Sequence, residues 1–188
     1  MRERRTKIDF SKHELHVTKN DDVLIHHLKV PGTYWESIKF INCHGIMAVT
    51  GDYGNWIFCR EFHPSADGYV SDSYWHEKLK IASEQEGTEF DSNATKEAIK
   101  EKLNEYKLQC NEDGEEPNEE IVEYYEECMN KCDDHELDYT HYAYREQPSE
   151  LDYDDVVFIK DYKYWLKAVF DGFDEICRRM KEEETKEQ

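Results

Sequence analysis

The fold is decided by residues 37–62, which read SIKFINCHGIMAVTGDYGNWIFCREF. Three apolar runs, at 37–43, 46–50 and 55–62, are rich in β-branched and aromatic residues, which suit a pleated, half-buried surface. The segments between the runs contain Gly45, Gly51 and Gly54, and glycine is typical of tight turns. The pattern therefore predicts a three-stranded antiparallel meander.

On the N-terminal side of this meander, shorter runs at 7–10 and 14–17 and a longer apolar run at 22–28 predict further strands. On the C-terminal side, Ser71 or Asp72 is expected to cap a helix that runs to about residue 83. Residues 84–89 are expected to form a connector.

Two helices are expected in the segment that follows. Asp91, Ser92 and Asn93 offer N-caps for a helix over 94–108, and residues 111–114 break the chain. Pro117 suits the first turn of a second helix, which runs to about residue 132. Its buried stripe is expected to consist of Ile121, Val122, Tyr125, Cys128, Met129 and Cys132.

The chain ends in the clearest amphipathic pattern. Residues 156–159 are expected to form a strand that pairs with the meander, and apolar residues recur at helical spacing from Tyr162 to Met180. We predict an α+β protein in which the N-terminal antiparallel β-meander packs on amphipathic helices. Its expected segments are a meander region with one helix (1–83), an acidic helical segment (84–158) and a C-terminal amphipathic helix on the sheet (159–188), together forming one compact unit.

The negative charge is concentrated in one segment. The chain has 44 Asp and Glu against 24 Lys and Arg, a formal net charge of −20. Residues 84–158 hold 25 acidic and six basic side chains, a net charge of −19, whereas the rest of the chain sums to −1. This charge argues against broad binding to DNA, RNA or anionic membranes.

Other classes of protein are also disfavoured. No apolar run approaches the length of a membrane span, and the first residues lack the apolar segment of a secretory signal. The six cysteines are expected to be reduced thiols of a cytoplasmic protein. His13-Glu14-Leu15-His16 lacks the spacing of a zinc-protease motif, and no phosphate-binding or nucleophile motif occurs. We therefore expect neither catalysis nor a cofactor.

The second acidic helix is the first candidate for a functional surface. Glu116, Glu119, Glu120, Glu123 and Glu127 are expected to form a row of carboxylates on one helix face, where residues four apart are about 6 Å apart along the axis. Such a row could imitate nucleic-acid phosphates and occupy a basic cleft. The alternative is an ordinary solvated helix face. Asp152, Asp154 and Asp155 are secondary candidates for partner contacts.

Zinc is a further alternative for the same helix. Cys128, Cys132 and His135, with Cys110 upstream, could supply ligands. Yet Cys128 and Cys132 coincide with the expected buried stripe, and free cysteine is among the most buried residue types. We therefore expect core packing and no metal.

Residues 37–62 also resemble small proteins carried by phages and mobile elements of gut Firmicutes, a group similar to one from which a type II anti-CRISPR protein, an inhibitor of Cas9, has been drawn. The resemblance brings no catalytic motif and transfers no site residue. It implies a non-enzymatic inhibitor that acts in the bacterial cytoplasm on Cas9 or its guide-RNA complex, which has basic nucleic-acid channels.

Four hypotheses of function follow. The first is a phage-encoded inhibitor of a nucleic-acid-binding defence effector, most of all Cas9, with an acidic face in a basic DNA-binding groove and little direct nucleic-acid binding. The second is a DNA mimic directed at a restriction enzyme or another nuclease. The third is a small metal-dependent enzyme, and the fourth is an acidic interaction module of a host complex.

Overall fold

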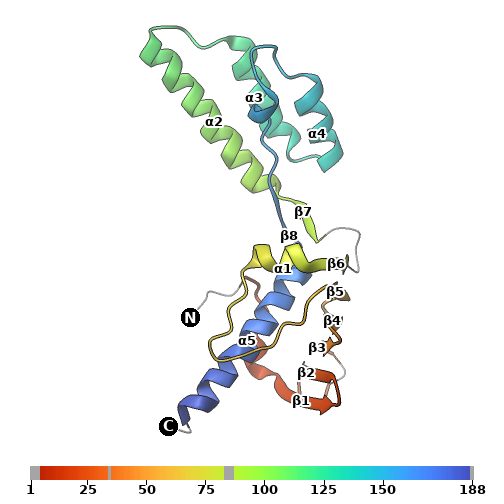
Figure 1. The fold of residues 1–188 in the computed structure, drawn as a ribbon. Helices are drawn as coiled ribbons and strands as arrows, with labels where there is room; N and C mark the ends of the chain where they lie inside the picture. Colours follow the sequence, from red (N-terminus) through yellow and green to blue (C-terminus); the bar gives the residue numbers. More distant parts are fainter. Residues whose placement is uncertain (1–4, 34, 83–86, 187–188) are drawn as a thin grey trace. The chain divides into compact units, whose positions relative to one another are not determined.

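The chain is α+β, as predicted, and divides into two compact units (Figure 1). The computed structural model describes residues 5–33, 35–82 and 87–186. Residues 1–87 and 162–188 form one unit, the sheet unit, and residues 88–161 form the other, the helical unit. The N-terminal strands and the C-terminal helix thus share one unit, and most of the acidic segment forms the other. No helix in the described ranges is both long and apolar enough to cross a membrane.

The sheet unit contains a six-stranded antiparallel sheet whose strands follow one another in chain order. The strands are β1 (Glu14–Asn20), β2 (Val23–Lys29), β3 (Ser37–Cys43), β4 (Ile46–Gly51), β5 (Trp56–Phe58) and β6 (Leu79–Ala82). The predicted meander is therefore confirmed as β3, β4 and β5. The strand predicted at residues 7–10 is wrong, because Phe10 begins a 3-10 helix, η1 (Phe10–Lys12), that buries its ring in the core.

The helix predicted from residue 71 is shorter than expected. Ser71 caps α1 (Asp72–Lys78) by accepting a hydrogen bond from the Tyr74 backbone N–H, as predicted. The chain then becomes extended at Leu79 and forms β6, because the open edge of β5 offers backbone partners. Leu79 and Ala82 also pack against the core in this form.

The segments that join the two units differ in part from the sequence prediction. Residues 84–86 of the expected connector lie outside the described residues, and its end joins β7 (Thr88–Phe90). Residues 156–159 are not a strand. The strand β8 (Lys160–Tyr162) follows them and pairs with β7 instead of with the meander. Val156, Val157 and Phe158 pack on the apolar cluster of the helical unit, which explains their apolar character.

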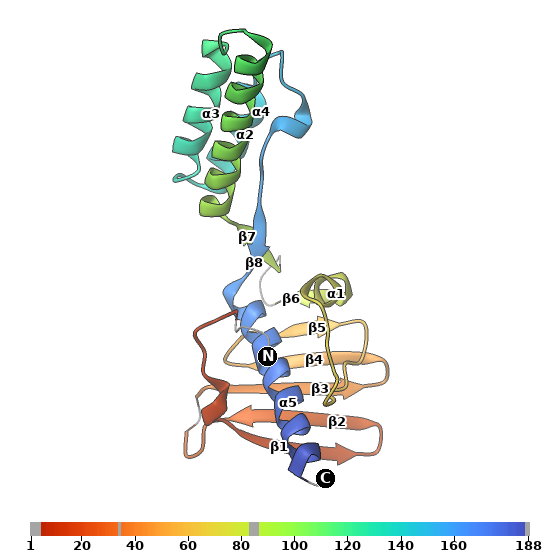
Figure 2. The same ribbon diagram turned by 90° about the vertical axis from the view of Figure 1, so that its left-hand side faces the viewer.

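One face of the sheet packs on the C-terminal helix α5 (Tyr164–Lys186), as predicted (Figure 2). Alternating residues of the sheet face this helix, whose own apolar stripe includes Val169, Phe170 and Phe173. The buried sheet residues are Leu28, Ile38, Phe40, Met47, Val49, Trp56 and Phe58. Trp75 of α1 completes the core and stacks on Phe62 with ring centroids 4.2 Å apart.

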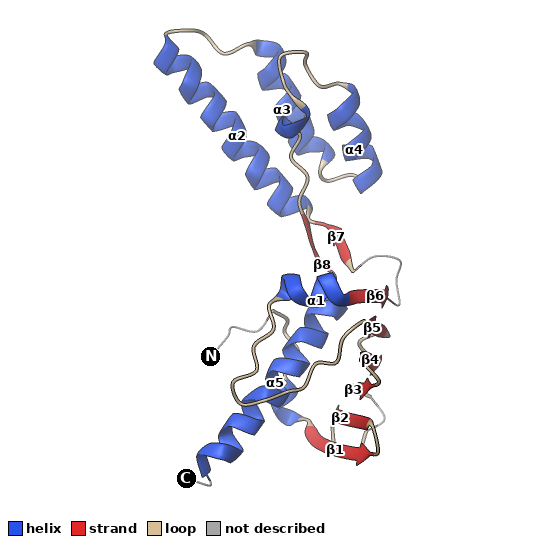
Figure 3. Ribbon diagram, in the orientation of Figure 1, coloured by secondary structure: helices blue, strands red, loops and turns tan. Residues whose placement is uncertain are grey.

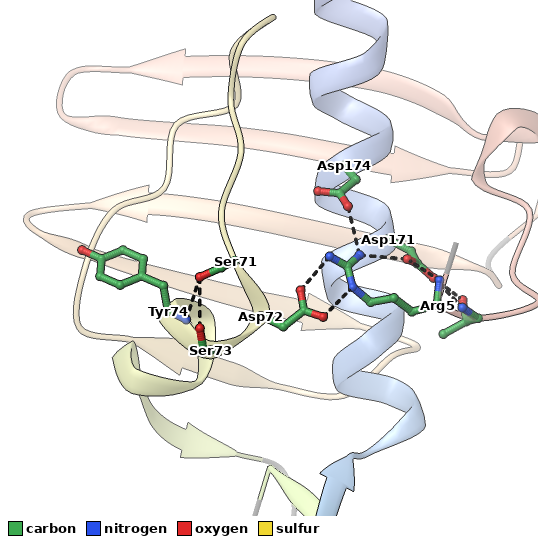
Figure 4. Close-up of polar contacts among 8 residues, drawn as sticks. Arg5, Ser71, Asp72, Ser73, Tyr74, Asp171 and Asp174 are labelled. Carbon is green, nitrogen blue, oxygen red and sulfur yellow. Dashed lines mark hydrogen bonds and ion pairs between the residues drawn. The ribbon is translucent and has the colours of Figure 1, made fainter. Parts of the chain in front are cut away.

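A partly buried ionic cluster ties the N-terminal segment to α5 and α1 (Figure 4). The Arg5 guanidinium donates to Asp171 at 3.0 Å, to Asp174 at 2.9 Å and to both carboxylate oxygens of Asp72. Asp171 also accepts hydrogen bonds from the backbone N–H groups of Arg5 and Thr6 and from the Thr6 hydroxyl. Although burial opposes it, hydrogen bonds to Asp72 and Asp174 raise the pKa of Arg5 above its usual range.

Gly51, at the end of β4, requires a conformation that other residues rarely adopt. Its φ is +136°, and a Cβ atom there would lie 2.1 Å from the backbone oxygen of Ser37. We expect Gly51→Ala to lower the free energy of unfolding by about 2 kcal/mol or more, since β3 must move away. Urea unfolding followed by tryptophan fluorescence measures this loss. Gly45→Ala at another positive-φ turn, where the added Cβ meets no atom within 4 Å, is the control and should cost less.

The helical unit consists mainly of α2 (Ser92–Asp113), α3 (Glu119–Lys131) and α4 (Glu136–Arg145), followed by the 3-10 helix η2 (Tyr153–Asp155) (Figure 3). Asp91 caps α2, as predicted, but the helix continues past its expected end at residue 108 and stops at Gly114, the last residue of the predicted break, which takes a left-handed conformation. Asn118 caps α3, so the helix begins at Glu119, and Pro117 lies before it rather than in its first turn. No element was predicted for residues 136–145, which contain Tyr139, Tyr142 and Tyr144 and form the helix α4.

Candidate functional site

The helical unit carries nearly all of the excess charge. Residues 88–161 include 24 acidic and seven basic side chains, a net charge of −17, and the sheet unit accounts for the remaining −3. The concentration of charge predicted from the sequence therefore coincides with one folded unit. A charge of this size is more than solubility needs.

A groove in this unit, the acidic groove, gathers several of these carboxylates. It has a volume of about 480 Å³ and lies along α3, the C-terminal half of α4 and the residue that caps α4. Its lining residues are Glu120, Glu123, Tyr124, Glu126, Glu127, Asn130, Tyr142 and Glu146. Five of these eight side chains are glutamates, and none is basic.

Tyrosine rings contribute the apolar part of the acidic groove. Tyr124 is buried, and its hydroxyl donates a 2.8 Å hydrogen bond to the backbone oxygen of Ala143, which holds α3 against α4. Burial raises the pKa of Tyr124, so this hydroxyl stays protonated. The Tyr142 ring lies parallel to it, with centroids 6.3 Å apart. The glutamates of the acidic groove thus lie around an aromatic pair in which Tyr124 is held by a hydrogen bond.

Most of the groove carboxylates have no cation near them. Among the described residues, Glu120, Glu123 and Glu126 form no ion pair. Glu127 is 3.6 Å from the Lys131 ammonium, and Glu146 is 3.3 Å from Arg145. Both of these pairs are solvent-exposed and therefore weak. A cationic partner could engage the groove without first breaking a strong interaction.

The structure brings together only part of the predicted row. Glu120, Glu123 and Glu127 line the acidic groove, whereas Glu119 begins α3 outside it. The placement of Glu116 on this helix is wrong, because the Asn118 cap starts α3 three residues later. Glu126 was not predicted as a site residue. It belongs to the exposed side of the predicted helix, and this position could have identified it as a candidate. Glu146 was missed because α4 was not predicted.

The three aspartates predicted as secondary contacts do not line the acidic groove. The Asp155 carboxylate accepts hydrogen bonds from the Lys102 ammonium and from the Asp152 backbone N–H, both at 2.9 Å. Lys102 also donates to the Asp154 backbone oxygen and is the main reason why the pKa of Asp155 is lowered. Asp155 therefore holds η2 to α2, while the side chains of Asp152 and Asp154 are exposed.

The cysteines of the helical unit belong to its core. Cys128 and Cys132 are 2% and 1% exposed and pack among Ile121, Tyr125 and other apolar residues, as predicted. Cys110 is also buried, and His135 precedes α4 with an exposed side chain. In the part of the chain that the structure describes, no three His, Cys, Asp or Glu side chains form a group that could hold a metal ion.

The burial of these thiols has a measurable consequence. Burial raises the pKa of Cys128 to about 12 and that of Cys132 to about 11, so neither is a reactive thiolate near pH 8. We expect a thiol reagent at pH 8 to modify exposed Cys59 within minutes and to reach Cys128 and Cys132 only after denaturation. Mass spectrometry of the labelled peptides checks this order. Rapid labelling of Cys128 in the native protein would contradict the buried position.

Comparison with protein-family models, curated proteins and solved structures finds no match to this chain.

Proposed function

We propose that the protein is a non-enzymatic inhibitor of a nucleic-acid-binding bacterial defence effector, with Cas9 as the first candidate target. The observation that carries the proposal is the acidic groove, in which five glutamates surround a tyrosine pair in a unit of net charge −17. The resemblance of residues 37–62 to proteins of phages and mobile elements supports the choice of target. It is independent of the charge argument.

The physical basis is competition for a basic surface. A guide-RNA effector holds its nucleic acids in positively charged channels. Glu120, Glu123 and Glu127 rise along α3 in steps of about 4.5 and 6 Å, so they present charge at spacings comparable with a phosphate backbone. Binding of this surface would release counterions from the channel as DNA does, and Tyr142 would add aromatic contact area. Acting in this way as a DNA mimic, the protein would let the phage or mobile element that encodes it evade host defence.

A DNA-cleavage assay with titrated protein tests the proposal. We expect cleavage by the Cas9–guide complex to fall to zero near a stoichiometric ratio when the protein is added before the target DNA. Addition after the DNA should inhibit much less, since the channel is then occupied. Full cleavage at a large molar excess, with Cas9 from several bacteria, would reject Cas9 as the target.

The same protein preparation tests the second class of target, a restriction enzyme or another nuclease. Restriction enzymes are tested in parallel reactions. If the protein inhibits one of these nucleases but not Cas9, it is still an inhibitor, but its target is that nuclease. Fluorescence anisotropy of labelled target DNA then shows whether the protein blocks DNA binding or a later step. We expect loss of DNA binding.

A further inference from the structure

The second face of the sheet carries an ordered apolar row that no helix in the described residues covers. Ile25, Ile41, Ala48, Ile57 and Ile81 stand opposite one another on β2, β3, β4, β5 and β6. We call this row the outer ladder. Its members alternate along the strands with the buried residues that face α5, so they point to the opposite side. None of them belongs to either apolar cluster of the described residues.

The ladder is accessible. Ile81 is 57% exposed, and the four other members are partly exposed. Strands lie about 4.8 Å apart, so the row from Ile25 to Ile81 is about 19 Å long. A continuous apolar surface of this kind on a highly charged chain is typical of an interaction site.

Two lysines lie beside the ladder on the same face of the sheet. The adjacent row on the same face contains His16, His27 and Lys39, which stand opposite one another on β1, β2 and β3. Lys29 lies on the same face beside His27, and neither lysine forms an ion pair in the described part of the chain. Because burial lowers the pKa of His27, the positive charge beside the ladder is that of Lys29 and Lys39. Glu14 is the one carboxylate that faces outward on the six strands, 3.4 Å from His16.

The size and chemistry of the face favour one kind of occupant. A face of about 19 Å by 20 Å offers about 400 Å² to a partner, roughly half of what each subunit of a stable dimer buries. A second copy would also bring a like-charged lysine edge to the interface. A nucleic-acid backbone offers no apolar surface to the isoleucines. A helix with an apolar stripe about 13 residues long matches the ladder, and carboxylates beside the stripe match Lys29 and Lys39.

We propose that the outer ladder is a docking surface for an amphipathic helix of a partner protein, with Asp or Glu flanking its apolar stripe. The docked helix lies across the strands on the aliphatic side chains, and its carboxylates pair with Lys29 and Lys39. This surface is separate from the acidic groove, and the proposal does not depend on the proposed function.

A designed peptide tests this docking on the full-length chain. The probe is an 18-residue helical peptide with a Leu and Ile stripe flanked by glutamates, titrated by fluorescence anisotropy at physiological ionic strength. We expect micromolar binding despite the overall negative charge of the protein. The double variant Ile41→Thr/Ile57→Thr should weaken binding at least about tenfold, and Lys29→Gln/Lys39→Gln should weaken it about threefold to tenfold.

The controls separate the proposed occupant from others. Threonine keeps the strand preference of isoleucine, and circular dichroism confirms that the variants fold. Val17→Thr, an exposed position on the opposite side of the sheet, is the matched control and should bind the peptide normally. Absence of binding, or equal binding by the ladder variant, overturns the proposal. The proposal is also overturned if the wild-type protein self-associates, or sediments with anionic lipid vesicles, and the ladder variant does not.

Discussion

Replacing Asp171 by alanine is expected to lower the free energy of unfolding of the sheet unit by about 3 kcal/mol or more. The Asp171 side chain is 2% exposed, and it accepts hydrogen bonds from the Arg5 guanidinium, from two backbone N–H groups and from the Thr6 hydroxyl. Its removal leaves these buried donors without their acceptor. The Arg5 guanidinium keeps its contacts with Asp72 and Asp174, so the loss comes mainly from the two backbone N–H groups and the Thr6 hydroxyl, each of which loses a buried acceptor.

The position of Asp171 explains why this loss affects the whole unit. Arg5 and Asp171 are 166 residues apart in the chain, and their contact joins the N-terminal segment to α5. The same guanidinium holds Asp72 of α1, so the cluster connects three parts of the core. Loss of Asp171 should therefore weaken the packing of α5 on the sheet.

Tryptophan fluorescence during urea unfolding measures the effect on the sheet unit alone. All four tryptophans, Trp35, Trp56, Trp75 and Trp165, belong to this unit, and the helical unit has none. Asp174→Ala is the matched control, because Asp174 is 28% exposed and holds Arg5 at a single nitrogen. It should cost about 1 kcal/mol. Equal losses in the two variants would show that Asp171 is not the central acceptor of the cluster.

The sequence predicts those elements whose own hydrophobic pattern is enough to define a strand or a helix. The meander and α5 are confirmed because Phe40 and Ile41, like Phe170 and Phe173, follow the strand or helix period closely. The strands β6 and β8 depend instead on their neighbours. Residues 79–82 continue a helical spacing from α1, and only the open edge of β5 makes them a strand.

The candidate site likewise has one part that the sequence predicts and another that depends on packing between helices. Helical spacing places Glu120, Glu123 and Glu127 on one face, and the structure brings them into the acidic groove. The groove itself exists because α4 packs against α3, and this contact depends on Tyr124 and Ala143. Neither residue signals it in the sequence, so Glu146 could not be assigned. The outer ladder likewise depends on strand register, which the sequence pattern alone does not define.

Changing the five groove glutamates to glutamine is expected to slow association with the target effector about 10- to 100-fold at low salt, with a proportional loss of inhibition. The set is Glu120, Glu123, Glu126, Glu127 and Glu146. Glutamine preserves the size of each side chain, and the two ion pairs that are lost are exposed, so the helical unit should remain folded. The change removes only the charge that a basic channel would recognise.

A matched control decides whether the groove or the total charge matters. The exposed residues Glu97, Glu101, Glu105, Glu112 and Glu115 lie outside the acidic groove, and their change to glutamine alters the net charge equally, from −20 to −15. We expect this control to associate within about threefold of the wild-type rate. The difference between the variants should shrink as ionic strength rises, because the Debye length falls from about 10 Å at 0.1 M salt to about 3 Å at 1 M. Stopped-flow measurements at several salt concentrations give the association rate of each variant and its dependence on ionic strength. Equal slowing would assign the effect to overall charge, and unchanged rates in both would mean that the inhibitor binds its target through another surface.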